Sequence, residues 1–310
     1  MPVLDLLATG YPSLDHIVRS SRCAGPGETA LVDGVIDETR ATPGGCGANV
    51  AVGLRRLGFA TGVALVLGDD AGGHAFRDAL AEAGVDVRNV TLLAGERSSH
   101  AYLFCSPDGE LQNFYFPGAA DAWRGDLRLV GLDEVRLALV TVNHLPYNQQ
   151  FVAQCAGAGV PIAWQLKPDI AAYPPHAVEA FARASRLIFC NRREARYLLE
   201  SLGVPDLRAL FALGVQAVVT TLGGDGAQVT TEDGDWTVPA VPVTAVDTTG
   251  AGDAFTSGYL AGYLRGLAPD ICARMGAVAA SFVVEAVGCQ TNLPDETRLN
   301  ARLQEVFERL

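Results

Sequence analysis

Short apolar segments alternate with longer, helix-like segments along most of this chain of 310 residues. The apolar segments have the length and composition of buried β-strands, and the segments between them have the roughly 10–15 residues of a covering helix. This alternation favours right-handed β–α–β units, and therefore an α/β fold with a doubly wound, mostly parallel sheet flanked by helices. The clearest strand-like segments are 3–9, 61–66, 137–142, 162–164, 187–190 and 217–221, and the clearest helix-like segments are 49–57, 73–83 and 148–158.

Two stretches, 11–42 and 97–116, break the alternation. The first contains Gly/Pro turns and short polar–apolar segments, and the second reads as a hairpin with strands at 100–105 and 111–116 and a turn at 106–109. Both follow strands of the main sheet, so we expect them to form one small β-sheet lid, a device that excludes water from a reaction. The predicted division is a core of residues 1–10, 43–96 and 117–310, and a lid of residues 11–42 and 97–116.

The charge balance argues against a nucleic-acid partner. The chain has 35 acidic and 23 basic residues, a formal net charge of −12. A nucleic-acid-binding face needs clustered basic side chains, whereas the longest basic runs here are Arg55-Arg56 and Arg192-Arg193. Lys167 is the only lysine, so the lysine-containing phosphate loop G-x-x-x-x-G-K-[ST] is absent. The dinucleotide loop G-x-G-x-x-G and a zinc-like spacing of histidines are absent as well.

The distribution of apolar residues and cysteines indicates the compartment. No apolar run reaches the roughly 18 residues of a membrane span, and residues 1–10 read as a first strand instead of a signal peptide. The seven cysteines are scattered singly, without a C-x-x-C pair. Scattered cysteines of odd number are typical of reduced thiols. We therefore expect a cytoplasmic protein without a membrane partner.

Residues 247–253, Asp-Thr-Thr-Gly-Ala-Gly-Asp, are the most informative stretch of the chain. Phe255, Tyr259 and Tyr263 follow at intervals of four residues, which predicts a helix with one buried face. The glycine-rich turn therefore lies at the start of a helix, where the helix dipole is positive.

The start of this helix is suited to an anion. Gly250, Ala251 and Gly252 leave backbone N–H groups unobstructed, and such groups bind phosphoryl oxygens. Asp253, in the first turn, can accept a proton from a hydroxyl that attacks a phosphorus atom. Spacing alone leaves a second interpretation equally open, in which Asp253 is only a capping residue of a glycine-rich helix start.

In this order, residues 247–253 resemble the C-terminal signature of the ribokinase-like (PfkB-type) family of carbohydrate and nucleoside kinases. Residues 44–58, which begin Gly-Gly-Cys-Gly-Ala-Asn, resemble the N-terminal signature of the same family. Residues 191–194 match its N-x-x-E element, and residues 221–226 resemble its nucleotide-binding loop. The four elements appear in the family's order and span nearly the whole chain. The resemblance implies a ribokinase-like fold and ATP-dependent phosphorylation of a hydroxyl group.

The resemblance also implies a role for each matching residue and, with these roles, the cofactors ATP and Mg²⁺. The implied roles are Asp253 as general base with Gly250, Ala251 and Gly252 as anion hole; Asp15, Gly44, Gly45 and Asn49 as substrate-binding residues; Asn191, Thr221, Gly223 and Gly226 as ATP-binding residues; Glu194 as a Mg²⁺ contact through water; and Asp247 and Thr249 as contacts of a monovalent cation such as K⁺. Simpler interpretations remain open for three of them. Asp15 could be a turn residue, Asn191 only a helix cap, and the glycines of 223–226 only a tight hairpin turn.

Two departures from the family bear on the substrate. Residues 164–168, Trp-Gln-Leu-Lys-Pro, stand where many members have a D-x-N-like stretch. Lys167 could replace a polar contact near the nucleotide, or it could be a surface residue, which is the interpretation we favour. Cys46 stands where ribokinases and phosphosugar kinases often have lysine. With no lysine and few basic residues expected near the cleft, an anionic phosphosugar is disfavoured. A neutral sugar is the expected substrate, with an adenosine-type nucleoside as the alternative.

The lid leaves two further questions open. Phe114, Tyr115 and Phe116 could stack on a nucleobase, or they could serve packing or a dimer contact. We expect a homodimer through the lid, because an open β-sheet has edges that need protection. A regulator that kept the fold and lost catalysis is a second alternative, although the presence of Asp253 and its glycines argues against it. Adenine contacts are left unassigned.

Overall fold

A computed structural model describes residues 3–34, 41–107, 111–168 and 172–307 of the chain. Within these residues the strands form one nine-stranded sheet and one four-stranded sheet. The strands of the large sheet, in spatial order, are β13 (Asp235–Val238), β12 (Ala227–Thr231), β11 (Ala217–Thr221), β10 (Leu187–Asn191), β9 (Ile162–Gln165), β8 (Ala138–Val140), β1 (Leu6–Thr9), β4 (Thr61–Gly68) and β5 (Asp86–Leu93).

The large sheet is parallel from β5 to β11, and only β12 and β13 run antiparallel to their neighbours. β1 lies between β4 and β8 and is buried along its whole length. A strand buried on both faces is expected when helices cover both sides of a parallel sheet. The predicted doubly wound α/β fold is confirmed.

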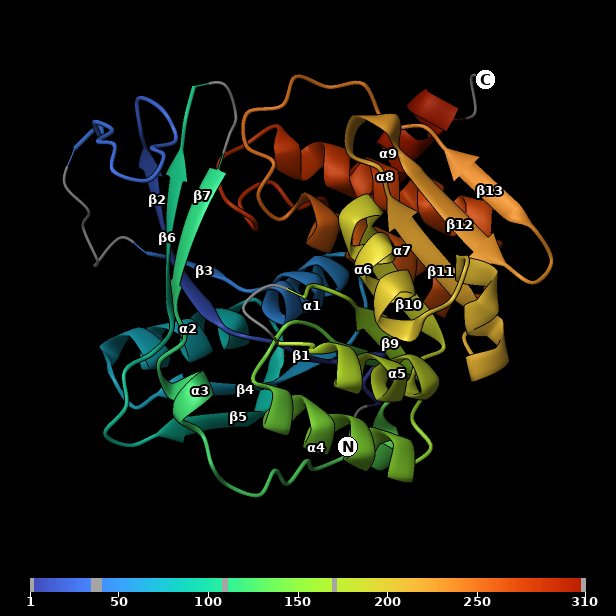
Figure 1. The fold of residues 1–310 in the computed structure, drawn as a ribbon, viewed down its shortest axis with the longest axis horizontal. Coiled ribbons are helices and arrows are strands. Elements are labelled where there is room, and N and C mark those ends of the chain that lie inside the picture. Colours follow the sequence, from blue (N-terminus) through green and yellow to red (C-terminus); the bar gives the residue numbers. More distant parts are fainter. Residues whose placement is uncertain (1–2, 35–40, 108–110, 169–171, 308–310) are drawn as a thin grey trace.

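Helices cover the two faces of the large sheet in two separate groups, each packed on its own hydrophobic core (Figure 1). One face carries α1 (Cys46–Arg56), α2 (Ala71–Glu82), α7 (Ala251–Leu264), α8 (Pro269–Val284) and α9 (Glu296–Phe307). The other face carries α3 (Ala119–Ala122), α4 (Leu145–Gly157), α5 (Pro175–Ala184) and α6 (Arg192–Leu202). Most helices begin two or three residues before the predicted position, because sequence periodicity locates helix centres better than helix ends.

Helix α7 differs from its prediction in burial. Every residue from Asp253 to Gly262 is buried, so the expected single buried face is wrong. Small residues allow this burial, because they let α1 and α8 pack closely against α7. A Cβ at Gly258 would lie 2.5 Å from the carbonyl oxygen of Met275 in α8, and a Cβ at Gly53 in α1 would lie 2.7 Å from Ser257 Oγ. The start of α7 is therefore held rigidly.

The four-stranded sheet is called the lid. Its strands, in spatial order, are β3 (Thr42–Gly44), β2 (Ser13–Arg19), β6 (His100–Cys105) and β7 (Leu111–Phe116). It extends away from the large sheet at the left of Figure 1. The strands come from the two stretches that break the alternation, although β3 crosses the predicted boundary at residue 43. Part of the predicted turn at 106–109 lies outside the described residues.

No helix in the described part of the chain is both long enough and apolar enough to cross a membrane.

Candidate active site

Four adjoining cavities lie where the strands of the large sheet end and the lid begins. The inner cavity, of about 150 Å³, is lined by residues that include Asp15, Asn49 and Asp253. The polar cavity, of about 230 Å³, is lined by Asn191 and Glu194, and again by Asp253. The carboxyl ends of parallel strands are the usual ligand-binding edge of such a sheet.

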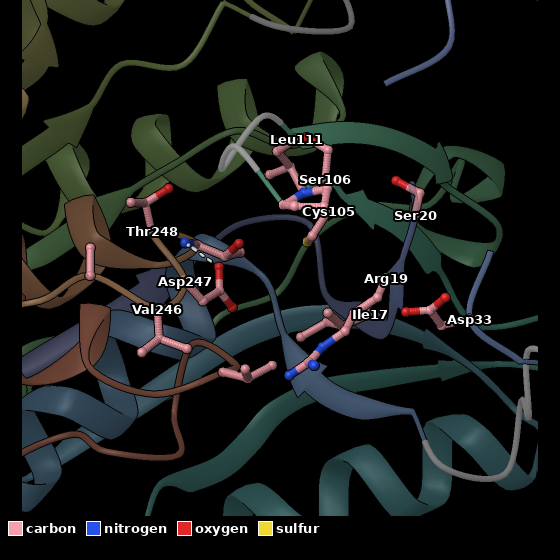
Figure 2. A pocket seen from close by; sticks show the side chains of 14 residues that line it. Ile17, Arg19, Ser20, Asp33, Cys105, Ser106, Leu111, Val246, Asp247 and Thr248 are labelled. Atoms are coloured by element: carbon pink, nitrogen blue, oxygen red, sulfur yellow. Dashed lines mark hydrogen bonds between the residues drawn. The ribbon is translucent and has the colours of Figure 1, made fainter. Parts of the chain in front are cut away.

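The other two cavities adjoin the first two and each other. The apolar cavity, of about 320 Å³, is lined largely by the 240–245 segment, α7 and α8. The lid cavity, of about 670 Å³, lies between the lid and residues 245–249 (Figure 2). Adjoining cavities have lining residues in common: Thr249 for the lid and inner cavities, Thr221 and Gly252 for the polar and apolar cavities, and Ala245 and Thr248 for the lid and apolar cavities.

Asp253 lies where the inner and polar cavities meet, and both of its carboxylate oxygens accept hydrogen bonds. Asn49 Nδ2 donates to Oδ2 at 2.8 Å, and Gln165 Nε2 donates to Oδ1 at 2.6 Å. Gln290 Nε2 in turn donates to Asn49 Oδ1 at 2.9 Å, which fixes the orientation of the Asn49 amide. The carboxylate is buried, with 6% of Asp253 exposed. It is therefore a positioned hydrogen-bond acceptor, as a general base must be.

The first turn of α7 offers donors to an anion. Gly250 has φ 78°, and a Cβ there would lie 2.8 Å from the Cβ of Cys289. Among the described residues, no acceptor is found for the N–H groups of Gly252 and Asp253. A Cβ at Gly252 would meet nothing within 4 Å, so the approach to these N–H groups is open. The predicted residues Gly250, Ala251, Gly252 and Asp253 thus form a helix terminus suited to phosphoryl oxygens.

Asp15 lies within strand β2 of the lid, so its interpretation as a turn residue is wrong. Its carboxylate lies against the Cα of Gly44, where a Cβ would come within 2.1 Å of Oδ2. Ser13 donates a hydrogen bond to its Oδ1. Gly45, with φ 93°, turns the chain into α1, and a Cβ there would lie 2.2 Å from the carbonyl oxygen of Tyr11. Of the four predicted substrate-binding residues, Asp15, Gly45 and Asn49 line the inner cavity and Gly44 does not. Their role in substrate binding stays a prediction.

The Asp15 carboxyl has an unusual pKa. Burial raises it from 3.8 to about 6, and the Asp253 charge adds to the rise, whereas the Ser13 hydrogen bond and the Lys167 ammonium oppose it. A carboxyl whose pKa is raised on folding stabilises the fold fully below its unfolded pKa and loses that contribution as the pH rises through its folded pKa. The contribution of Asp15 is therefore present below about pH 4 and lost above about pH 6.

We expect Asp15→Asn to raise the melting temperature at pH 8 more than at pH 4. The difference between the effects at the two pH values corresponds to roughly 2–3 kcal/mol of unfolding free energy, at about 1.4 kcal/mol per pKa unit. Calorimetry of both proteins at both pH values measures this difference. Asp126→Asn, at an exposed position, is the control and should change the melting temperature equally at both. An equal effect of Asp15→Asn at the two pH values would contradict the prediction.

Asn191 and Glu194 form a capping box at the start of α6. Asn191 Oδ1 accepts from the Glu194 N–H at 2.9 Å, and Glu194 Oε2 accepts from the Asn191 N–H at 2.7 Å. Asn191 is thus a helix cap, and both residues also line the polar cavity. Within the described residues, no cluster of three or more His, Cys, Asp or Glu side chains could hold a metal directly. This donor set fits a Mg²⁺ ion carried by phosphates and water, with Glu194 as a contact to its water ligands.

Asp247 stabilises the loop before α7. Its Oδ1 accepts from the Thr249 N–H and its Oδ2 from the Gly288 N–H, both at 2.9 Å. Asp247 and Thr249 also line the lid cavity. The predicted cation contacts are therefore adjacent, and the Asp247 carboxylate ties the 247–250 turn to the segment at Gly288.

The predicted ATP-binding residues Thr221, Gly223 and Gly226 line the apolar cavity. Gly223–Asp225 is also the 3₁₀ turn between the antiparallel strands β11 and β12, so the hairpin interpretation holds at the same time. At Gly226, with φ 94°, a Cβ would lie 2.0 Å from the carbonyl oxygen of Val238. Glycine is required there by both conformation and close approach.

Two expectations about the substrate need correction. Lys167 is not a surface residue, because it lines both the inner and the polar cavity. The preference against an anionic substrate depended on there being no lysine near the cleft, and the position of Lys167 shows that this premise is wrong. Of the three lid aromatics, only Tyr115 lines the inner cavity, whereas Phe114 and Phe116 are 58% and 47% exposed. Side chains alternate between the faces of a strand, so neighbouring residues cannot all reach one cavity.

Sequence reasoning missed several residues of the site. Neither Gln165 nor Gln290 has a role predicted from the sequence. Their contacts with Asp253 and Asn49 join segments more than 80 residues apart in sequence, which no local pattern reveals. The apolar cavity supplies the missing candidates for adenine contacts, in particular Val241, Phe255 and Ala280. Their only signal in the sequence was their apolar character.

Comparison with known proteins gives consistent results. The chain matches the family model described as pfkB family carbohydrate kinase over residues 8–296. A curated nucleoside kinase of Methanothermobacter thermautotrophicus is 29% identical over 292 residues, which cover 94% of this chain and 93% of the relative.

Solved structures show the same fold. The Burkholderia thailandensis nucleoside kinase in complex with inosine has a TM-score of 0.88 at 24% identity, and the match covers 98% of each chain. The Arabidopsis thaliana ribokinase complexed with ribose and ATP has a TM-score of 0.79 at 23% identity, and the match covers 98% of this chain and 99% of the other.

Proposed function

This chain belongs to the pfkB family of carbohydrate kinases, and from that premise we propose that it transfers the γ-phosphoryl group of ATP to the ribose of a nucleoside. Its relatives are named nucleoside and sugar kinases, and it is an enzyme of this carbohydrate or nucleoside kinase class. The observation that carries the finer proposal is the group of four adjoining cavities, two of which meet at Asp253.

The lining of each cavity suggests which group it binds. The adenine of ATP would occupy the apolar cavity, its phosphates the polar cavity, and the ribose of the acceptor the inner cavity. Asn191 and Glu194 would contact the phosphates and the water ligands of Mg²⁺, which lowers the repulsion between phosphate oxygens when it is bound. Two relatives of the same fold support ATP as donor and a nucleoside as acceptor, since one is complexed with ribose and ATP and the other with inosine.

The transfer itself needs a base and an anion site. The acceptor hydroxyl oxygen bonds to the γ-phosphorus, while the bond from that phosphorus to the bridging oxygen breaks and ADP leaves with its electron pair. Asp253 takes the hydroxyl proton. The N–H groups at Gly252 and Asp253 receive the oxygens of the transferred group. Asp15 accepts hydrogen bonds from the other acceptor hydroxyls and fixes their position.

Cavity size favours a nucleoside over a free sugar. The inner cavity, at about 150 Å³, is smaller than the roughly 300–1,000 Å³ typical of sites for larger organic ligands, and it suits a single sugar ring. The adjoining lid cavity, at about 670 Å³, offers space for a second ring system. Its apolar walls, Ile17 and Leu111 on the lid and Val246 on the core, can hold the two faces of a base (Figure 2). A neutral free sugar remains the second candidate, because the inner cavity alone accommodates it.

An assay of ADP release with MgATP tests this proposal. The acceptors are nucleosides, neutral sugars and sugar phosphates, each with and without K⁺. We expect the highest kcat/KM with a nucleoside, and stimulation by K⁺ if Asp247 and Thr249 contact a cation. Absence of turnover with every acceptor, while ATP still binds, would contradict the proposed function and favour a non-catalytic regulator.

Val246→Trp separates the two acceptor classes. Val246 is 60% exposed and lines the lid cavity, so an indole there fills the proposed base site. We expect kcat/KM for the nucleoside to fall at least about 10-fold, equivalent to about 1.4 kcal/mol, and turnover of free ribose to stay unchanged. Val130→Trp is the control, because Val130 is 52% exposed and lines none of the four cavities. Equal effects of Val246→Trp on both acceptors would contradict the nucleoside assignment.

The lid also supports the proposal of a homodimer. Phe114 and Phe116 are exposed on the edge strand β7, whose only partner in the described sheet is β6. Exposed aromatic side chains on an unpaired edge mark an interaction surface. Sedimentation equilibrium should give twice the chain mass for the native protein and the chain mass for Phe114→Glu.

All seven cysteines are free thiols, which supports the proposal that the protein is cytoplasmic. Fractionation of cells tests this location.

A further inference from the structure

Four residues line both the inner and the polar cavity. They mark the position at which a phosphoryl group would pass from ATP to the acceptor hydroxyl. The shared lining residues are Cys46, Lys167, Gly250 and Asp253. Asp253 and Gly250 already have roles in the proposed reaction. Burial and the Asp253 charge raise the pKa of the Cys46 thiol above its ordinary range, so this side chain stays neutral. Lys167 is the remaining charged group at the junction.

We propose that Lys167 is a catalytic residue that contacts the phosphoryl group during transfer. This inference rests on the proposed kinase function, and it names the residue that neutralises the charge of the transferred group. The hydroxyl oxygen bonds to phosphorus, ADP leaves with the electron pair, and Asp253 takes the proton, as above. Lys167 itself makes and breaks no covalent bond; its ammonium donates hydrogen bonds to phosphoryl oxygens that carry charge in the transition state.

The charges around the junction support a need for this cation. Asp15, Asp253 and Glu194 bring three carboxylates to the walls of the inner and polar cavities. Among the described residues that line these two cavities, Lys167 is the only one with a positively charged side chain. A triphosphate that enters a site with three carboxylates meets strong repulsion, which is large where water is excluded. The Lys167 ammonium is close enough to the junction to oppose the rise in the pKa of both Asp15 and Cys46.

The local structure directs Lys167 to this place. Gln165 ends strand β9 and donates a hydrogen bond to Asp253. Lys167 follows two residues later, and side chains two residues apart in an extended chain lie on the same side. Leu166, between them, is buried in the core. The end of β9 thus supplies two neighbouring side chains to the junction: one holds the proposed base, and the other reaches the space beside it.

The composition of the chain is consistent with this role of Lys167. Of 23 basic residues, Lys167 alone is lysine, and the other 22 are arginine. A lysine ammonium is a compact charge with three rotatable donors, whereas the arginine guanidinium is larger and planar. The one lysine of the chain therefore brings the smaller of the two cations to the junction of the inner and polar cavities.

The first test compares Lys167→Met and Lys167→Arg with the native enzyme, using the nucleoside or sugar that gives the highest turnover. We expect Lys167→Met to lower kcat by about 10²–10³-fold, the usual loss when one donor to a transition-state oxyanion is removed. The KM for a neutral acceptor should stay within about threefold, and Lys167→Arg should recover part of the rate. Arg192→Met is the control, because Arg192 is exposed and lines none of the cavities.

The second test does not depend on turnover. Reductive methylation with ¹³C-formaldehyde labels the amino terminus and one lysine side chain, so Lys167 gives a single identifiable NMR resonance. We expect this resonance to shift when MgADP, aluminium fluoride and the acceptor are added together, and to move little with MgADP alone. Lys167→Met, which lacks the resonance, confirms its assignment, and melting temperatures verify that each variant is folded.

The outcomes separate the inference from the function it rests on. If the native enzyme turns over and Lys167→Met keeps its rate, or if the resonance is insensitive to the transition-state mimic, the inference is wrong and the kinase function stands. If Lys167→Met raises only the KM of phosphorylated acceptors, Lys167 binds an anionic substrate instead, which also overturns the inference. If the native enzyme phosphorylates no acceptor, the proposed function itself fails.

Discussion

Asp253→Asn is expected to lower kcat by at least about 10²-fold, the usual contribution of a positioned general base, while MgATP should still bind. The substitution preserves the size of the side chain and removes its capacity to take a proton. The hydrogen bonds from Asn49 and Gln165 currently orient both carboxylate oxygens, so the native base is fixed before the acceptor arrives. Steady-state kinetics give kcat, and calorimetric titration with an ATP analogue gives the affinity.

Asp270→Asn is the matched control for this substitution. Asp270 also lies in the first turn of a helix, α8, and pairs with Arg274 at 3.4 Å, but it lines none of the four cavities. The same change of charge at this position should leave kcat within about twofold, as is usual for surface sites. An Asp253→Asn enzyme with the native rate would remove Asp253 from the mechanism.

Gly44→Ala is expected to lower kcat/KM for the acceptor by at least about 10²-fold. The added Cβ would lie 2.1 Å from Asp15 Oδ2, so the carboxylate must rotate out of the inner cavity. Each hydrogen bond that a charged group makes contributes about 1.5–3 kcal/mol, and the acceptor would lose those it makes to Asp15. The affinity for ATP should not change, because Gly44 lines neither the polar nor the apolar cavity.

Gly157→Ala is the control for a glycine substitution without a collision. Gly157 ends helix α4, and a Cβ there meets no atom within 4 Å. Alanine has the higher helix propensity, so this variant should keep full activity and be slightly more stable. Acceptor kinetics that are unchanged in Gly44→Ala would show that Asp15 does not hold the acceptor.

The fold was predictable because its signals are local. Each buried strand of the parallel sheet is a short apolar run, and each covering helix is a periodic segment between two such runs. The lid was recognisable because its two stretches lack that alternation. Helix α7 was misjudged, because the positions outside its apolar stripe are Gly, Ala and Ser. An analysis of periodicity assigns these small residues to an exposed face of the helix. In the structure they are buried and let α1 and α8 approach α7 closely.

The site was only partly predictable, for a different reason. Asp15, Asn49 and Asp253 belong to recognisable motifs, and the structure brings them to one cavity. Lys167 and Gln165 belong to none of the motifs recognised in the sequence. Their position beside Asp253 depends on how the end of strand β9 lies relative to the start of α7. Because side chains alternate on β7, either Tyr115 or its two neighbours can line the inner cavity, but not all three. The amino-acid pattern does not indicate which face of the strand meets the cavity.

The lid strand β2 carries Asp15, whereas Asp253 belongs to helix α7 of the core. The two carboxylates that contact the proposed acceptor therefore sit on separate parts of the protein. A nucleoside has hydroxyls for both and can link the lid to the core. A water molecule bound to Asp253 has no second hydroxyl for Asp15 and leaves the two parts unlinked. On the proposed mechanism, the division of the site between two sheets would therefore favour transfer to an acceptor with several hydroxyls over transfer to water, and so limit hydrolysis of ATP.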